Sequence, residues 1–335
     1  MIKIIIAITL LMVGFFFKGP TIFFEVKPFA ETEPVLSKTD AADDICIWTW
    51  GIHENETLII GTDKDAGLEV YLLSGKRINH FPFGRINNID VVSKETNRIL
   101  IAGTNRSFQS IDIYEVFKNG EINRLFSQKL DEGFSDLYGL CAFKIDSKNF
   151  IVITDQEEKS LSKFELLGDQ LRLVDRIYFN STCEGIVADV NHNRLLVNEE
   201  DIGIWVVTLN EFSKSKKLIL ETNKKDILPD LEGISIYQKS QYEGLYIFSI
   251  QGKNRFGILD RKNMNYLGQF SIIKNNEIDG VQETDGLDIS SLPCYGNKKG
   301  ILVVQDGFNK GGNQNFKIIS MESILFNLAY YFKRS

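Results

Sequence analysis

Acidic residues recur at one position of a repeated pattern in this 335-residue chain. Four times, an acidic or phenolic residue precedes a glycine at the start of an apolar run, and two related runs open on aspartate and asparagine. The six runs begin at Asp44, Asn88, Tyr138, Glu184, Glu232 and Asp285, which are 44, 50, 46, 48 and 53 residues apart. A second apolar run that ends in polar residues follows each of them.

These run ends could supply oxygen ligands for a hard cation. In an antiparallel pair, the start of the first strand and the end of the second lie at the same edge of the sheet. If the first strands line a common axis, one face collects Asp43, Asp44, Tyr138, Glu157, Glu184, Glu199, Glu200, Asp230, Glu232, Gln251, Asp285 and Asp306, together with glycine carbonyls. Like charges disfavour each other's ionisation, so this many carboxylates need a counter-charge. Numerous oxygen ligands favour calcium over magnesium, and a solvated acidic rim is the alternative.

Two basic residues occupy equivalent places in the pattern. Lys64 follows the second run of the first repeat, and Arg106 follows that of the second. An ammonium and a planar guanidinium beside metal ions are what a phosphate ester requires, although each alone is ordinarily a solubility group. No histidine lies in an Arg-His-Gly-x-Arg setting, and no cysteine has an arginine six positions later. Phosphohistidine and cysteine-nucleophile mechanisms are therefore disfavoured.

Short strands must position these residues. Each repeat holds three apolar runs, and a period in this range with three or four strands per unit is typical of propeller blades. We therefore expect an all-β fold, a six-bladed β-propeller that forms one domain over residues 36–330. The longest helix candidate is Met321–Tyr331.

The amino terminus predicts export. An apolar run over residues 4–17 is too short for a comfortable membrane span, so residues 1–19 indicate a signal peptide or, alternatively, an uncleaved anchor. We expect a linker over residues 20–35 and a secreted or periplasmic protein, membrane-anchored in the alternative case. Export would make Cys46, Cys141, Cys183 and Cys294 eligible for disulfide bonds, and buried free thiols are the alternative. The net charge of -7 disfavours nucleic-acid binding.

Specific motifs run through the chain in order. They are DAADD at Asp40, TDKDAGLEVY at Thr62, GRINNIDV at Gly84, TNRS at Thr104, LYG at Leu137, CEG at Cys183, EED at Glu199, DLEG at Asp230, SIQGKN at Ser249, IDGVQETDGLD at Ile278, VQDGFN at Val304 and NQNFK at Asn313. From about Asp40 to Ile324 the chain resembles the β-propeller phytases, calcium-dependent enzymes that release phosphate from myo-inositol hexakisphosphate (phytate).

The resemblance implies a role for each matching residue. A catalytic calcium cluster would be held by Asp43, Tyr138, Glu184, Glu200, Asp230, Glu232 and Gln251, and structural calcium ions by Asp44, Asp285, Gly286 and Asp306. Substrate contacts would come from Lys64, Arg106, Tyr138 and either Lys159 or Gln156. Lys64, Arg106, Glu184 and Glu200 would be catalytic, with a metal-activated water attacking in line. The expected partner is phytate as its calcium complex, and the enzyme is expected to be a monomer without an obligate protein partner.

Three departures from the family pattern concern the outer phosphate site and one structural calcium. Asp65 stands where a second lysine is usual, Phe308 stands where a carboxylate is usual, and the loop at residues 310–312 is shortened. Two other classes stay open: a calcium-dependent hydrolase of the lactonase type, and a non-catalytic, calcium-stabilised binding propeller. The first has no use for Lys64 plus Arg106.

Overall fold

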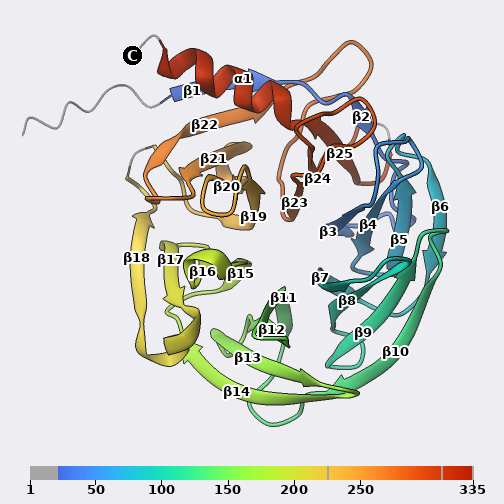
Figure 1. Ribbon diagram of the computed structural model, residues 1–335, viewed down its shortest axis with the longest axis vertical. Coiled ribbons are helices and arrows are strands. Elements are labelled where there is room, and N and C mark those ends of the chain that lie inside the picture. Colours follow the sequence, from blue (N-terminus) through green and yellow to red (C-terminus); the bar gives the residue numbers. More distant parts are fainter. Residues whose placement is uncertain (1–21, 225, 311, 334–335) are drawn as a thin grey trace, which may run out of the picture.

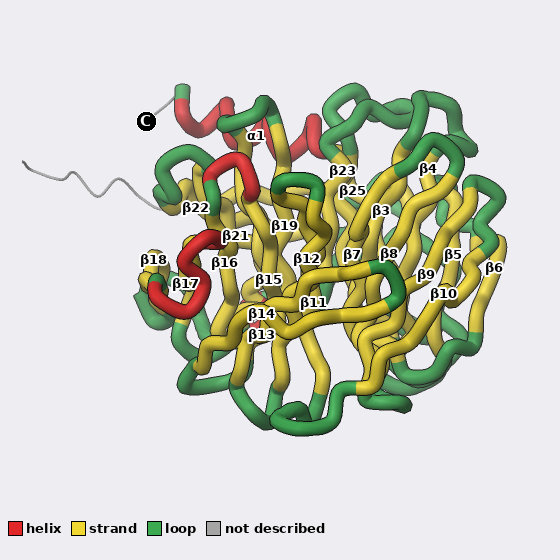
Figure 2. The backbone as a smooth tube through the Cα atoms, turned by 60° about the horizontal axis from the view of Figure 1, so that its bottom comes forward, coloured by secondary structure: helices red, strands yellow, loops and turns green. Residues whose placement is uncertain are grey.

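Six small sheets stand in a ring around one axis (Figure 1). The computed structural model describes residues 22–224, 226–310 and 312–333, and the predicted signal peptide lies outside them. Turned by 60°, the strands run side by side between loops that gather at their two ends (Figure 2). The fold is the all-β, six-bladed propeller that the repeat predicts. Among the described residues, no helix is both long and apolar enough to cross a membrane.

Each blade has four strands that follow one another from the axis outward, and blade 5 gains a fifth at its outer edge. Blade 1 comprises β3 (Ala42–Thr49), β4 (Thr57–Asp63), β5 (Gly67–Leu72) and β6 (Arg77–Phe81). Blade 2 comprises β7 (Ile86–Lys94), β8 (Arg98–Asn105), β9 (Ser110–Phe117) and β10 (Ile122–Lys129). Blade 3 comprises β11 (Leu137–Ile145), β12 (Lys148–Asp155), β13 (Ser160–Leu167) and β14 (Gln170–Tyr178).

Blades 4 to 6 repeat this plan. Blade 4 comprises β15 (Cys183–Asp189), β16 (Arg194–Glu199), β17 (Gly203–Thr208) and β18 (Lys216–Glu221). Blade 5 comprises β19 (Leu231–Gln238), β20 (Gly244–Ile250), β21 (Arg255–Asp260) and β22 (Tyr266–Ile272). Blade 6 comprises β23 (Leu287–Ser290), β24 (Ile301–Asp306), β25 (Asn315–Ser320) and β2 (Ala30–Glu31). Single turns of 3-10 helix lie at Val190–His192 and Gln251–Lys253, and a longer 3-10 segment at Leu209–Lys214.

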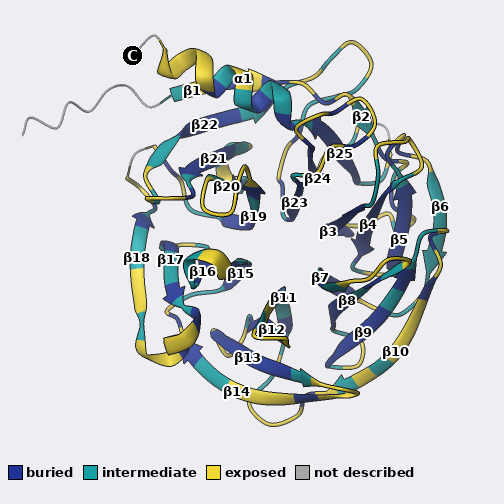
Figure 3. Ribbon diagram, in the orientation of Figure 1, coloured by how far each residue is buried: buried dark blue, intermediate teal, exposed yellow. Residues whose placement is uncertain are grey.

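Burial falls from the axis to the rim (Figure 3). Strands β3 and β4 are buried throughout, whereas more than half of the residues of β10 are exposed. Side chains of neighbouring blades interlock: the Phe316 ring of blade 6 lies 6.0 Å from the Tyr71 ring of blade 1, in the space that Gly61 leaves free. Burial of each such large side chain stabilises the packing of one blade on the next by about 2 kcal/mol.

The amino-terminal segment closes the ring. Strand β2 pairs antiparallel with β25 and supplies the outermost strand of blade 6, and β1 (Ile22–Val26) pairs in parallel with β22 as a fifth strand of blade 5. The expected linker over residues 20–35 thus contains two strands, because the open edges of β22 and β25 offer unpaired backbone groups. Helix α1 (Met321–Phe332) forms in the segment where the sequence predicts a helix, and it lies along β1 (Figure 1). All four cysteines are buried free thiols.

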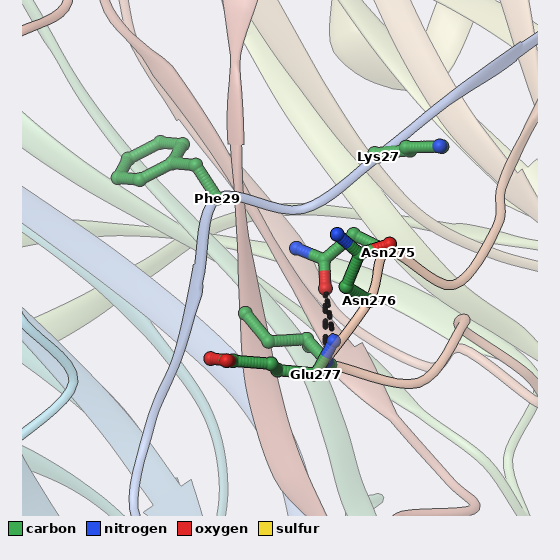
Figure 4. A pocket seen from close by; sticks show the side chains of 6 residues that line it. Lys27, Phe29, Asn275, Asn276 and Glu277 are labelled. Atoms are coloured by element: carbon green, nitrogen blue, oxygen red, sulfur yellow. Dashed lines mark hydrogen bonds between the residues drawn. The ribbon is translucent and has the colours of Figure 1, made fainter.

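The chain between β1 and β2 crosses the loop that follows β22. The side-chain amide of Asn275 donates to the Pro28 carbonyl at 2.8 Å, and its oxygen accepts the backbone N–H of Glu277 at 2.9 Å. Figure 4 shows these loop residues opposite Lys27 and Phe29 across a hollow of about 440 Å³. This crossing fixes the amino-terminal segment at the outside of the ring.

Candidate active site

A β-bulge recurs near the start of five inner strands. In blade 1 the register slips between Ala42 and Ile45, and β7, β11, β15 and β19 slip at the equivalent points. Two residues per blade therefore leave the ladder, and a bulge re-aims a side chain. The first of each pair is Asp43, Asn87, Tyr138, Glu184 or Glu232, and Asp285 before β23 takes the sixth place. We call these six residues the bulge ring.

The second bulge residue explains the repeated acid–glycine pairs. A Cβ on Gly185 would lie 2.0 Å from the backbone oxygen of Glu232, and one on Gly286 would lie 2.5 Å from that of Asp43. Only glycine lets the next blade approach this closely. The backbone of Gly286 is itself part of the blade contacts, because its N–H donates to the Asp43 carbonyl at 3.1 Å and its carbonyl accepts from Gln305 at 3.0 Å.

A second ring comes from the residue after each second strand. Its backbone N–H donates to the loop that enters the same blade, as from Lys64 to Ala41 at 2.7 Å and from Arg106 to Arg85 at 2.8 Å. These residues, which we call the turn ring, are Lys64, Arg106, Gln156, Glu200, Gln251 and Gly307. In blade 3 the position belongs to Gln156, and Lys159 lies exposed three residues further on.

Three carboxylates of the two rings converge. Glu184, Glu200 and Glu232 each offer an oxygen atom within 4.8 Å of the other two. Glu184 Oε2, Glu232 Oε2 and Asp43 Oδ1 are buried, and none accepts a hydrogen bond from a described residue. A buried oxygen without a donor costs free energy. The donor set of carboxylates, with the phenol of Tyr138 nearby, therefore fits a hard cation that prefers oxygen ligands.

The carboxyl groups of this cluster disfavour each other's ionisation. Burial raises the pKa of Glu232 well above its ordinary value, and the neighbouring Glu184 adds to the shift. Burial and Glu184 likewise raise the pKa of Glu200 to about 8. The pKa of Asp285 rises to about 7 because burial outweighs the opposing Lys64 ammonium. Without a cation, these groups hold protons near neutral pH.

The Lys64 ammonium lies on the Asp285 side of the bulge ring. Its Nζ is 3.4 Å from Asp43 Oδ2, 3.4 Å from Asp285 Oδ2 and 3.1 Å from Asp40 Oδ2. Burial opposes its charge, but these three carboxylates outweigh burial and raise the pKa of Lys64. The side-chain amide of Gln251 donates to the second oxygen of Asp285. The Lys64 side chain therefore stays charged near neutral pH.

The Arg106 guanidinium is held on two sides. Its Nε and Nη2 donate to the two oxygens of Asp136 at 2.8 and 2.6 Å, and its Nη1 donates to Asn87 Oδ1 at 3.1 Å. The guanidinium carbon also lies 5.9 Å from the centre of the Tyr138 ring. A planar fork fixed in this way suits the recognition of phosphate oxygens.

Acidic and amide residues line a hollow of about 410 Å³ beside Lys64. They include Asp40, Asp230, Gln251, Asp285 and Gln314. Asp230 has a φ of 74°, the left-handed region, and is held there by its N–H to the Glu200 carbonyl at 3.0 Å and its carbonyl to the Gln251 N–H at 2.9 Å. Aspartate tolerates this region because its short side chain can form local hydrogen bonds.

Other predicted ligands hold loops. In four blades the last residue of the second strand is a buried acid whose side chain accepts backbone N–H groups of an adjacent loop. These acids are the predicted ligands Glu199 and Asp306 and, in addition, Asp63 and Asp155, which the sequence did not single out. One oxygen of Glu199 accepts two of them, at 2.6 and 2.7 Å. Asp306 Oδ1 accepts two, at 3.0 and 3.4 Å, and its Oδ2 accepts no hydrogen bond from a described residue but lies 3.1 Å from Lys317 Nζ. Protein donors thus occupy both oxygens of Glu199, whereas one oxygen of Asp306 faces an ammonium.

Two further predicted residues lie apart from the convergent carboxylates. Asp44, the second bulge residue of blade 1, is buried, and its Oδ2 accepts the backbone N–H of Ile89 in blade 2 at 3.0 Å. Burial raises its pKa. Glu157 is exposed in the turn after β12. Asp44 therefore contributes a bond between blades.

Sequence reasoning missed Asn87, Asp136 and Asp40. Asn87 was hidden because the repeat was aligned on Asn88, whereas the bulge aligns Asn87 with Tyr138 and Glu184. Alignment of the first two repeats one residue earlier would have found it. Asp40 and Asp136 lie in loops, where no periodic signal marks a residue.

Comparisons with known proteins identify the family of the chain. The chain matches the family model described as Phytase over residues 9–330. The 3-phytase of Bacillus subtilis (strain 168) is 31% identical over 332 residues, which cover 91% of this chain and 86% of that protein.

Solved structures share the fold at low identity. A protein of unknown function from Bacteroides thetaiotaomicron has a TM-score of 0.58 at 12% identity, covering 88% of this chain and 72% of its own. U3-55K has a TM-score of 0.54 at 10% identity, covering 88% of this chain and 100% of its own. These two show the fold alone. The family match spans nearly the whole chain, and this protein therefore belongs to the phytase family of phosphoric monoester hydrolases.

Proposed function

We propose that this enzyme releases phosphate from phytate in a calcium-dependent reaction at the bulge and turn rings. The observation that carries the proposal is the trio of buried carboxylate oxygens without donors, on Asp43, Glu184 and Glu232. Glu200 extends this trio to a set that contains only oxygen ligands. Calcium takes six to eight oxygen ligands and tolerates irregular geometry, which supports calcium rather than magnesium.

The chain's own residues support phosphoryl transfer. Bound calcium would supply positive charge to the phosphate oxygens and lower the pKa of a coordinated water. Arg106 presents a fixed planar fork, and Lys64 a permanent point charge, for the oxygens that gain charge as the ester bond breaks. An acidic face repels a polyanion, so we propose the calcium complex of phytate as the substrate.

Phosphate release from phytate, measured with calcium and after exhaustive chelation, tests the proposal. We expect chelation to abolish the activity and calcium to restore it. Glu184→Gln and Arg106→Ala should each lower kcat about a hundredfold, the typical cost of one lost charge-stabilising group. Arg98→Ala is the matched control, since Arg98 pairs with Glu95 and Glu115 at the far end of the same blade.

Two outcomes would reject this function. Full activity after chelation would remove the calcium dependence, and wild-type kcat in both site variants would place the reaction elsewhere. Hydrolysis of lactones without release of phosphate would favour the lactonase class. We further propose, from the apolar run in residues 1–19, that the enzyme is exported.

A further inference from the structure

Asn87 is the one amide in the bulge ring. The other five places hold four carboxylates and a phenol, at Asp43, Tyr138, Glu184, Glu232 and Asp285. Asn87 is fully buried. An amide at this position sets blade 2 apart from the other blades, and blade 2 also carries Arg106 on the turn ring.

The contacts of Asn87 fix the orientation of its amide. Its Oδ1 accepts from Arg106 Nη1 at 3.1 Å, and its Nδ2 donates to Glu184 Oε1 at 3.3 Å and to Asn88 Oδ1 at 2.8 Å. A guanidinium only donates, and a carboxylate only accepts. A group that joins the two must accept on one side and donate on the other, and an amide does both.

The same contacts decide which Arg106 donors remain free. A guanidinium has five N–H groups. Asp136 takes Nε–H and one N–H of Nη2, and Asn87 takes one N–H of Nη1. One N–H of Nη1 and one of Nη2 therefore donate to no described residue. Guanidinium N–H groups left free in this way can bind phosphate oxygens.

We propose that Asn87 is a positioning residue that couples the anion-binding fork of Arg106 to the Glu184 carboxylate. The inference rests on the proposed function in one respect, namely that phosphate binds at Arg106. A cation held by Glu184 would fix its carboxylate, the carboxylate would orient the amide of Asn87, and the amide would orient the plane of the Arg106 guanidinium. Cation binding and anion binding then reinforce each other, although Arg106 need not touch the cation.

A double-mutant cycle tests this coupling without turnover. Binding of inorganic phosphate is measured by calorimetry, with and without saturating calcium, in wild type, Asn87→Leu, Arg106→Ala and the double variant. Leucine matches asparagine in shape but offers neither donor nor acceptor. We expect Asn87→Leu to weaken phosphate binding about tenfold when Arg106 is present and less than twofold when it is alanine, as expected for directly coupled residues. The loss of phosphate affinity caused by Asn87→Leu should be larger with calcium bound than without it.

Asn79→Leu provides the matched control. Asn79 is a partly buried amide on β6 that donates to the Gly120 carbonyl at 2.9 Å, far from the bulge ring in its blade. It should leave phosphate binding unchanged. If Asn87→Leu does not fold, the cycle is run with Asn87→Ala, which adds no new contact.

The outcomes separate the two proposals. Equal weakening by Asn87→Leu in both Arg106 backgrounds would overturn the coupling, as would a loss no larger than that of the Asn79 control. If wild type binds phosphate with the expected coupling but releases none from phytate, the proposed function fails and the role of Asn87 stands. If wild type binds no phosphate with calcium present, both are wrong.

Discussion

Replacing Lys317 with methionine tests how the ring is closed. The Lys317 ammonium lies 2.6 Å from Glu31 Oε2, 2.6 Å from Asp279 Oδ1 and 3.1 Å from Asp306 Oδ2, and its side chain is 0% exposed. These carboxylates belong to β2, to the loop before β23 and to β24. One buried charge thus holds the amino-terminal strand against the last blade. Methionine keeps most of the volume and removes the charge.

Removal of one partner from a buried ion pair costs about 3–5 kcal/mol, because the charges left behind have no counter-charge. In a domain of this size 1 kcal/mol corresponds to about 2 °C, so Tm should fall by about 6–10 °C. Burial already raises the pKa of Asp306 to about 6 although Lys317 opposes it, and loss of Lys317 raises it further. When a carboxyl group has a higher pKa in the folded protein than in the unfolded chain, the protein loses stability as the pH rises. The part of the deficit that comes from Asp306 should therefore grow between about pH 5 and about pH 8. The part that comes from Asp279, whose pKa Lys317 lowers, should be present throughout this range.

Thermal unfolding across this pH range is the assay, and Lys163→Met is the control. Lys163 is also buried, but its Nζ donates to the Leu209 carbonyl at 3.0 Å and lies 4.4 Å from the centre of the Phe150 ring, without an ion pair to any described residue. Its replacement should cost about 1 kcal/mol, the effect of one unpaired carbonyl, at every pH tested. A smaller loss for Lys317→Met than for this control, or a loss independent of pH, would refute the reasoning.

Three more predictions follow from the site. Because burial raises the pKa of Glu200 to about 8, the Tm of the chelated protein should fall as the pH rises from about 5 to about 8. Calcium should raise Tm more at the upper end of this range, which calorimetry can measure. Gly185→Ala should cost about 3 kcal/mol in urea unfolding, since its Cβ would meet a backbone oxygen at 2.0 Å, whereas Gly168→Ala, with nothing within 4 Å, should cost only about 1 kcal/mol of backbone strain. Asp65→Lys adds a cation beside Lys64 and should lower KM for calcium phytate several-fold at low salt, and an unchanged KM would make the exposed Asp65 a turn residue only.

The repeat in the sequence was sufficient to predict six blades and the first three strands of each. Alternating apolar residues and turn residues act within one hairpin, so strands such as β8 and β13 appear close to where the pattern placed them. The pattern also indicated that Glu184, Glu200 and Glu232 would share one face, because the ends of paired strands share an edge and the first strands of all blades line one axis. The hairpins depend on neighbours close in the chain, and the shared face depends on the repeat.

The sequence by itself determined the blades and the residue types at their ends, and the tertiary structure decided what each residue does. Glu199 and Asp306 have the chemistry of metal ligands but accept loop N–H groups. The bulge decided that Asn87, not Asn88, stands with the acids, and Asn87 meets Glu184 across 97 residues of chain. Lys317 meets Glu31 across 286 residues. Such contacts form only when segments distant in the chain pack together, and no local periodicity encodes that packing.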